Sequence, residues 1–306
     1  MKSPRRAVSG VLLLNKPAGI SSTSAVGWAK RLFNAAKAGH TGTLDPFATG
    51  LLPICFGEAA KFARFHLDAD KRYRATLKLG ERSSTGDTEG DIVETRAVAC
   101  SHEVVRNVLA AKIGPAQQTP PMHSAIKIDG VPLYKLARKG IEAVRPARDI
   151  EIFALQCVEW TPPLLVVDAH VSKGTYVRVL AEDIGEALGC GAHLVALERT
   201  GSGAIGIHQA VSFDALEKLG LDELDALLLP PVTLAESLPE IALGERDSIA
   251  FSNGRVISGL AHGARGIVRV YGPRHTFLGV AQASEAGGTI TLVAERLMNT
   301  QLAQSD

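Results

Sequence analysis

The chain has 306 residues, of which 46% are hydrophobic and 21% are charged. That length allows one large domain and one small domain, and the composition excludes a disordered, highly charged chain. The net charge is only +1, so the overall balance does not by itself indicate a nucleic-acid partner. An RNA-binding interpretation must therefore rest on where the basic residues lie.

The cysteine spacing and the apolar runs limit where such a protein works. Cysteines stand at positions 55, 100, 157 and 190, and no two form a C-x-x-C pair. This spacing disfavours a zinc ribbon and is typical of reduced thiols in the cytosol. The apolar run at 11–14 is too short for a signal peptide, and no run approaches the ~18 residues that span a bilayer. We therefore expect a soluble, cytoplasmic protein without a membrane segment.

The first half of the chain alternates between strand and helix patterns. Gly10–Asn15 reads as a buried strand, and Ser21 and Ser22 can cap the helix that follows it. A loop rich in Gly and Thr then runs from 39 to 50, and Lys71–Leu79 alternates as a half-buried strand. Ser101–Ile113 has helical spacing. The side chains that we expect to face inward in that helix are Val104, Val105, Val108 and Leu109.

The middle of the chain predicts a hairpin, a short helix, two strands and a longer helix. Ile126–Val131 contains the turn signal Asp129-Gly130, and Tyr134–Lys139 precedes the helix stop Gly140. Strands are expected at Asp149–Trp160 and Leu164–Ser172. Helical spacing covers Thr175–Leu188 and ends at Gly189.

The last third of the chain changes composition. The acidic segment Asp214–Asp225 and the prolines after it indicate a linker region. Short strands at Ile267–Tyr271, Phe277–Ala281 and Thr289–Val293 then predict a small β-barrel or sandwich. The fold class is therefore α+β: a mixed, mainly antiparallel sheet with flanking helices, followed by a small β domain. We place the two domains at residues 1–238 and 239–306.

The most informative segment is Gly39–Gly50, with the sequence GHTGTLDPFATG. Its glycines, threonines and Asp-Pro step predict a tight polar loop whose backbone amides can approach a ligand closely. Pro46 favours an extended backbone at Asp45. Taken alone, the spacing favours the plainer interpretation, in which Asp45 simply caps a turn.

Five segments in unbroken order make the chain resemble one known family, over about residues 10–210. They are GVLLLNKPAGISS, GHTGTLDPFATG, KRYRATLKLG, TPPMHSAIKIDGVPLYKLARKG and SKGTYVRVLAEDIGEALGCGAHLVALERT. Together they are similar to the bacterial transfer-RNA pseudouridine-55 synthases of the TruB type. The resemblance implies an isomerase with the pseudouridine synthase fold that needs no cofactor and no metal.

The resemblance also implies roles for particular residues. Asp45 matches the catalytic Asp, which would act as a covalent nucleophile on C6 of the uracil or on C1′ of the ribose. Arg178 matches its cationic partner, and Tyr73 matches the tyrosine that stacks on the target base and could relay a proton. Tyr176 matches a second tyrosine of the site. Leu197 matches an apolar residue of the pocket floor.

The implied partner is the T stem-loop of tRNA, from which a uridine must be extruded. His40 matches the histidine that enters the RNA loop beside the flipped base. Lys16 matches the lysine of an N-K-P turn, with either a structural role or a phosphate contact. Basic residues gather at 61–82 and 127–148, and either strip could follow phosphates.

In this family the second strip belongs to an inserted segment, here about 121–149, that grips the RNA. The C-terminal domain resembles a PUA-like RNA-binding module. We expect a monomer.

One departure and three alternatives remain open. The family often has two arginines after the leucine that matches Leu197, whereas here Glu198 precedes Arg199, which leaves the local ion pairs in doubt. A tRNA-folding chaperone with secondary or absent catalysis would need only the basic strips and the β module. A two-carboxylate hydrolase would need an acidic partner for Asp45, and Asp87 in its polar loop reads as solvated. The scattered histidines disfavour a metal site.

Overall fold

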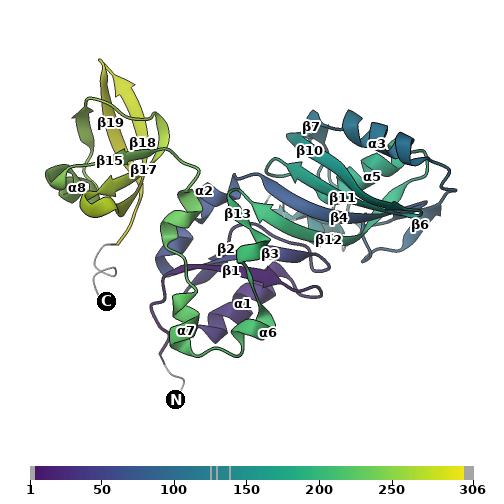
Figure 1. Ribbon diagram of the computed structural model, residues 1–306, viewed down its shortest axis with the longest axis horizontal. Helices are drawn as coiled ribbons and strands as arrows, with labels where there is room; N and C mark the ends of the chain where they lie inside the picture. Colours follow the sequence, from purple (N-terminus) through teal and green to yellow (C-terminus); the bar gives the residue numbers. More distant parts are fainter. Residues whose placement is uncertain (1–3, 125, 129, 138, 300–306) are drawn as a thin grey trace.

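The computed structural model describes residues 4–299 except 125, 129 and 138, and the described strands form a ten-stranded sheet, a five-stranded sheet and two two-stranded hairpins (Figure 1). Ten of the described strands form the larger sheet. They are β1 (Gly10–Lys16), β2 (Ala38–His40), β3 (Thr49–Phe56), β4 (Lys71–Leu79), β7 (Gly114–Gln118), β10 (Arg148–Thr161), β11 (Leu164–Val171), β12 (Ala192–Ser202), β13 (Ile205–Gly206) and β14 (Val211–Ser212).

The larger sheet is mixed and mainly antiparallel, as predicted. Its main path runs β14-β1-β3-β12-β4-β11-β10-β7, and among the described strands of this sheet only the pairs β1–β14 and β3–β12 are parallel. β3 and β12 pair over just two positions, Thr49 with Glu198 and Gly50 with Arg199. This short contact joins the two halves of the sheet. The predicted strands at the start of the chain, at Lys71–Leu79 and at Asp149–Ser172 are confirmed.

Helices cover the core side of each half (Figure 1). α1 (Ser22–Leu32) is capped by Ser21 and packs its buried stripe on β3. α3 (His102–Ala111) lies on β10, and α5 (Val177–Ala187) lies on β12 and β4. In α3 the predicted inward position of Val104 is wrong: Val104 is 45% exposed, whereas Val105 and Leu109 are buried. The helix sits on the sheet along the 105–109 stripe, which turns Val104 toward solvent.

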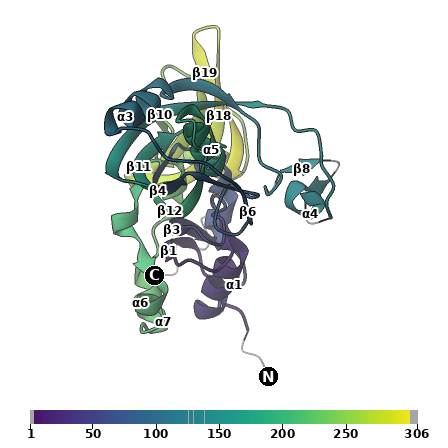
Figure 2. The same ribbon diagram turned by 90° about the vertical axis from the view of Figure 1, so that its right-hand side faces the viewer.

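A small arm projects from the body of the protein (Figure 2). It consists of the hairpin β8 (Lys127–Ile128) and β9 (Val131–Pro132) and the short helix α4 (Leu133–Ala137). These confirm the predicted hairpin and helix, although Asp129 of the turn signal lies outside the described residues. A second hairpin, β5 (Glu81–Ser83) and β6 (Ile92–Thr95), carries the polar loop 84–91 between its strands.

The acidic segment that we interpreted as a linker is part of the larger domain, so that interpretation is wrong. It forms α6 (Phe213–Leu216) and α7 (Leu221–Ala226). Leu216 and Leu224 are buried in the main core, and Asp225 pairs with Arg6. The acidic side chains gave the segment its polar composition, but one leucine of each short helix is buried and anchors the segment in the main core.

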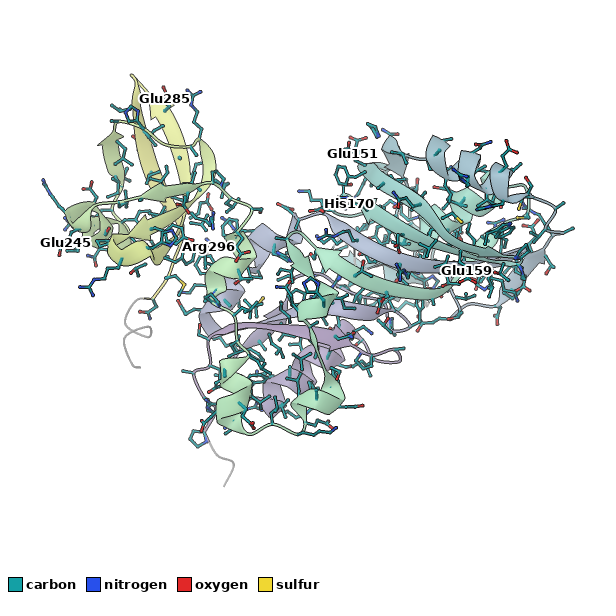
Figure 3. The ribbon with its side chains drawn as sticks, viewed as in Figure 1. Glu151, Glu159, His170, Glu245, Glu285 and Arg296 are labelled. Atoms are coloured by element: carbon teal, nitrogen blue, oxygen red, sulfur yellow. The ribbon has the colours of Figure 1, made fainter. Side chains whose placement is uncertain are left out.

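The C-terminal strands form an open, curled sheet in the order β15-β17-β18-β19-β16, a half-barrel. These elements are β15 (Glu240–Ala242), α8 (Glu245–Ser252), β16 (Ile257–Leu260), β17 (Gly266–Gly272), β18 (Thr276–Ala286) and β19 (Thr289–Leu297). They include all three predicted strands. Figure 3 places Glu245, Glu285 and Arg296 on this unit, and Glu151 and Glu159 far from it on β10.

The half-barrel contacts the larger domain through an apolar cluster. Phe277 packs against Phe62 with ring centroids 5.2 Å apart, and Val280 is buried in the same cluster. β18 contacts the 3₁₀ helix η3 (Pro231–Ala235). β19 reaches the 3₁₀ helix η1 (Gly57–Lys61) through a hydrogen bond from Lys61 to the Leu297 carbonyl, and helix α2 (Ala63–Leu67) through the ion pair of Arg64 with Glu295. The remaining 3₁₀ turns are η2 (Ile207–Gln209) and η4 (Pro273–His275). Within the described ranges, no helix is long and apolar enough to cross a membrane.

Candidate active site

Asp45 lies in the loop between β2 and β3, beside the short contact that joins the two halves of the larger sheet. The hydroxyl of Ser22, on the first turn of α1, donates to the carbonyl of Leu44 at 2.9 Å and accepts from the Leu44 amide at 2.8 Å. The Gly19 amide also donates to the Pro46 carbonyl at 2.9 Å. The backbone on both sides of Asp45 is therefore fixed by the turn and helix that precede it.

Lys16 holds the same loop through hydrogen bonds to backbone carbonyls. Its side chain is fully buried, and its Nζ atom donates to the carbonyls of Pro17, Ile20 and Pro46 at 2.8, 2.9 and 3.3 Å. Burial lowers the pKa of Lys16 to about 8, although the Asp45 charge opposes this shift. Of the two roles considered for Lys16, the geometry fits the structural one, since an amine with no exposed surface does not reach a substrate phosphate.

Arg178 brings a guanidinium to Asp45 from the first turn of α5. Its Nε atom lies 3.0 Å from Oδ2 of Asp45, and its side chain is 6% exposed. Nη1 donates to the carbonyl of Thr85 at 3.2 Å, and Nη2 donates to that of His123 at 2.8 Å. One planar group thus holds the nucleophile candidate, the polar loop 84–91 and the base of the arm together.

Asp87 is a further member of this network, and our interpretation of it as solvated is wrong. Its side chain is 2% exposed, and Oδ2 lies 3.4 Å from Nη1 of Arg178. Oδ1 accepts from the Thr85 hydroxyl at 2.5 Å and from the Glu89 amide at 2.9 Å. The polar sequence of the loop suggested exposure, but the Asp87 carboxylate bonds to the Thr85 hydroxyl, to the Glu89 amide and to Arg178 instead of to water.

Asp45 differs from Asp87 in being accessible. One third of its side-chain surface is exposed, whereas Asp87 is closed off by its partners. Burial raises the pKa of the Asp45 carboxyl, the Arg178 charge lowers it, and the Asp87 charge raises it. A carboxylate that is partly desolvated and held by one guanidinium is a stronger nucleophile than a hydrated one. Of these two carboxylates, therefore, only Asp45 is accessible to a substrate.

Tyr73 lies on β4 with its side chain half-buried against the main core. It stands opposite Arg199 of β12 in the sheet register, and the two side chains share a hydrogen bond. Arg199 in turn donates from Nη2 to the Gly42 carbonyl at 3.1 Å. His40 accepts from the Gly42 amide through Nδ1 at 3.2 Å. Burial and the Arg199 charge lower the pKa of His40, which leaves its ring neutral at pH 7.

Tyr176 and Leu197 take positions on the neighbouring elements. Tyr176 is the residue before α5, and both its backbone amide and its carbonyl bond to the side-chain amide of Gln118, at 2.7 and 3.1 Å. Gln118 is 4% exposed, so it fixes the turn that leads to Arg178. Leu197 is buried opposite Ala75, and its carbonyl accepts from the Thr49 hydroxyl at 3.5 Å.

The departure at Glu198 does not reach the site. Side chains alternate along β12, and Glu198 stands opposite Arg74 on the other face from Arg199. Arg74 forms two hydrogen bonds of 2.8 Å with Asp168 on the adjacent strand. Glu198 thus extends a row of alternating charges on the outer face of the sheet.

Several residues of this site were not identified from the sequence: Ser22 as a loop clamp, Asp87, Gln118 and Arg199. The usable signal was the polar loop 84–91 itself, because a run of Ser, Thr, Gly and Asp can satisfy a buried cation. Across the part of the chain that the structure describes, no group of three or more His, Cys, Asp or Glu side chains is arranged to hold a metal ion.

Three family models match consecutive parts of the chain. The model described as "TruB family pseudouridylate synthase (N terminal domain)" matches residues 30–177. "tRNA pseudouridylate synthase B C-terminal domain" matches 178–234, and "Pseudouridine synthase II TruB, C-terminal" matches 239–298.

Curated relatives match over nearly their whole length. The chain is 52% identical over 300 residues to "tRNA pseudouridine synthase B" of Thiobacillus denitrificans, covering 98% of this chain and 99% of the relative. It is 50% identical to the protein of the same name from Burkholderia mallei, covering 97% and 99%. The corresponding protein of Ralstonia nicotianae is 49% identical, covering 96% and 92%.

Solved structures show the same fold at low sequence identity. The first, titled "Crystal Structure of a Cbf5-Nop10-Gar1 Complex", aligns with a TM-score of 0.74 at 24% identity, covering 94% of this chain and 84% of that chain. A second, "Structure of H/ACA RNP bound to a substrate RNA containing 2'-deoxyuridine", has a TM-score of 0.72 at 21% identity, covering 97% and 91%. These two structures show the fold, whereas the family models and the curated relatives show that the chain belongs to the TruB family and is a tRNA pseudouridine synthase, an isomerase.

Proposed function

We propose that the protein converts the uridine at position 55 in the T-loop of tRNA to pseudouridine, with Asp45 as the nucleophile. The observation that carries this proposal is the 3.0 Å contact between Arg178 and an Asp45 side chain that keeps one third of its surface exposed. A carboxylate held ionised at an open position is what a covalent step on a flipped nucleotide requires.

The reaction is an isomerisation and consumes nothing. The bond between C1′ and N1 breaks, the uracil turns within the site, and a bond forms between C1′ and C5. The hydrogen on C5 leaves as a proton, and N1 takes up a proton. Asp45 forms a bond to the substrate at C6 of the uracil or at C1′ of the ribose and leaves again in the second half of the reaction. Neither route requires a cofactor.

The side chains around Asp45 suit a flipped uridine. The Tyr73 ring stacks on the uracil, an interaction worth about 1–3 kcal/mol. Tyr176 and Leu197 complete the walls of the pocket. His40, whose ring is neutral at pH 7, fills the place that the uridine leaves in the RNA loop.

The two basic strips differ in how they can meet RNA. Most of the cations in 61–82 are occupied: Arg64 pairs with Glu295, Arg74 with Asp168, and Lys71 is buried. On the arm, Lys127, Lys135 and Lys139 are exposed, and among the described residues they form no ion pairs. We therefore assign the phosphate contacts chiefly to segment 121–149, whose base is tied to Arg178 through the His123 carbonyl.

The proposal also assigns a role to each domain and an oligomeric state to the protein. Residues 1–238 form the catalytic domain and 239–306 a PUA-like RNA-binding domain, of which 300–306 lie outside the described residues. The protein acts as a monomer on the T stem-loop, and light scattering should give a mass near 32.3 kDa.

The test uses an unmodified tRNA transcript and chemical mapping of pseudouridine along its length. We expect a single modified position, 55, and no product from a transcript with cytidine there. Product at another uridine with position 55 untouched would overturn the assignment. A protein that refolds the transcript without forming pseudouridine would instead be the chaperone considered above.

A further inference from the structure

Arg199 is a buried cation directly behind the Asp45 loop. Its side chain is 2% exposed, and Nε donates to the carbonyl of Leu51 at 2.7 Å. Nη2 donates to the carbonyl of Gly42 at 3.1 Å. Gly42 and Leu51 lie on opposite sides of Asp45 in the sequence, so one guanidinium fixes both ends of the segment that presents the nucleophile.

The approach of β3 to Arg199 is unusually close. Gly50 has a φ of +102°, and a Cβ atom on it would lie 2.5 Å from the Arg199 carbonyl oxygen. Only glycine avoids that overlap with fixed backbone and adopts this φ without strain. β3 and β12 therefore meet here with no side chain between them. Because the Arg199 side chain bonds to the carbonyls of Gly42 and Leu51, a shift of β12 at Arg199 would also shift the Asp45 loop.

The same guanidinium also reaches Tyr73. The two residues face each other across β4 and β12, and their side chains share a hydrogen bond. An arginine only donates, so the Tyr73 oxygen is the acceptor. The hydroxyl proton of Tyr73 is therefore left free to bond to another group.

Burying Arg199 is unfavourable if its only role is to fill space in the core. Burial lowers its pKa, and no carboxylate in the described part of the chain forms an ion pair with it. A buried cation without a counter-charge costs free energy that an apolar side chain of similar length would not. Its three separate partners indicate a role that needs directed donors.

We propose that Arg199 is a positioning residue of the isomerisation, which sets the Tyr73 hydroxyl relative to the Asp45 loop. This rests on the proposed function and deepens it. Tyr73 and Asp45 belong to different halves of the sheet. Proton transfer by Tyr73 and attack by Asp45 on the same nucleotide require a fixed distance and orientation between the two side chains. A displacement of about 1 Å in such a site can lower the rate about 100-fold.

The test compares Arg199→Lys with Glu198→Gln, its neighbour on the opposite face of β12. Lysine keeps the charge and loses the planar fork that reaches three partners. In single-turnover reactions at saturating tRNA, we expect Arg199→Lys to lower the rate by about 10- to 100-fold while the Kd for tRNA stays within about twofold. Glu198→Gln should match the parent. Circular dichroism and thermal melting confirm that both variants are folded.

A second measurement distinguishes positioning of Tyr73 from general loosening. Tyr73→Phe removes the hydroxyl and keeps the stacking ring. If Arg199 acts through that hydroxyl, the double variant Arg199→Lys, Tyr73→Phe loses less than the product of the two single losses. Reactions followed for hours keep losses of up to about 10⁴-fold measurable.

An Arg199→Lys rate equal to the parent, or losses that multiply, would overturn the inference. The failure of the proposed function is a separate result. It would show as undiminished pseudouridine formation at position 55 by Asp45→Asn, whatever the Arg199 variants do.

Discussion

The Nε atom of Arg178 lies 3.0 Å from Oδ2 of Asp45, and the two residues come from segments 133 positions apart in the chain. Arg178 is itself held by two carbonyls and by Asp87, so its position does not depend on Asp45. The guanidinium is therefore in place before the nucleophile is used, and it stabilises the ionised carboxylate at every stage where that charge reappears.

Replacing Arg178 by lysine should strongly reduce the rate. A single ammonium cannot bond to Asp45, the Thr85 carbonyl and the His123 carbonyl in the directions that a planar guanidinium serves. We expect the single-turnover rate of Arg178→Lys to fall by about 100-fold or more, with tRNA affinity measured by filter binding little changed. A rate within twofold of the parent would contradict the role of the bond network.

Asp87 should matter although it does not touch substrate. Asp87→Asn keeps the shape of the side chain and removes the charge that holds Nη1 of Arg178. We expect the rate to fall by about 10- to 100-fold through loss of Arg178 alignment. The matched control is Asp91→Asn, an exposed residue of the same loop, which should retain the parental rate.

The pH dependence of the rate should reflect the environment of Asp45. Burial raises its pKa above the ordinary 3.8, and the nucleophile is the ionised form. As the pH falls, activity should therefore be lost at a higher pH than for an ordinary aspartate. Asp87 also raises the pKa of Asp45, so Asp87→Asn should move this acid limb to lower pH while lowering the plateau. A limb that moves upward would contradict the assignment of the limb to Asp45.

Lys16→Met tests whether that lysine contacts RNA. A lysine that neutralises a phosphate contributes about 0.7–0.9 to the slope of log K against log salt concentration. Because Lys16 is fully buried and bonds to three carbonyls, we expect the slope to be unchanged and the unfolding free energy to fall by about 1–3 kcal/mol. A slope reduced by one contact would show that Lys16 reaches the backbone of the RNA.

Periodic patterns revealed most of the fold. Lys71–Leu79 alternates strictly and forms β4, and the apolar spacing after Ser21 forms α1. β3 and β12 were not predicted. Pro53 lies inside β3, where a proline ordinarily argues against a central strand, and β12 shifts register between Leu194 and Ala196 and again after Arg199. Such bulges break the period of two on which strand prediction depends.

The candidate site was identified through resemblance and not through pattern. Composition alone left Asp45 as a turn residue, because nothing local distinguishes a nucleophile from a cap. Asp87 and Arg199 were missed for a physical reason. A charged side chain in a polar loop, or in a strand whose alternation is broken by bulges, reads as exposed. Only the tertiary structure shows the backbone carbonyls and hydroxyls that bond to it when it is buried.

The central claim is that Asp45 performs the covalent step, and Asp45→Asn tests it most directly. The variant keeps nearly the same shape and removes the charge that Arg178 holds. Single-turnover conversion of position 55 in an unmodified tRNA should fall by about 10⁴-fold or more, while the Kd for that tRNA stays within a few-fold of the parent. Conversion at a rate near the parental one would contradict the account.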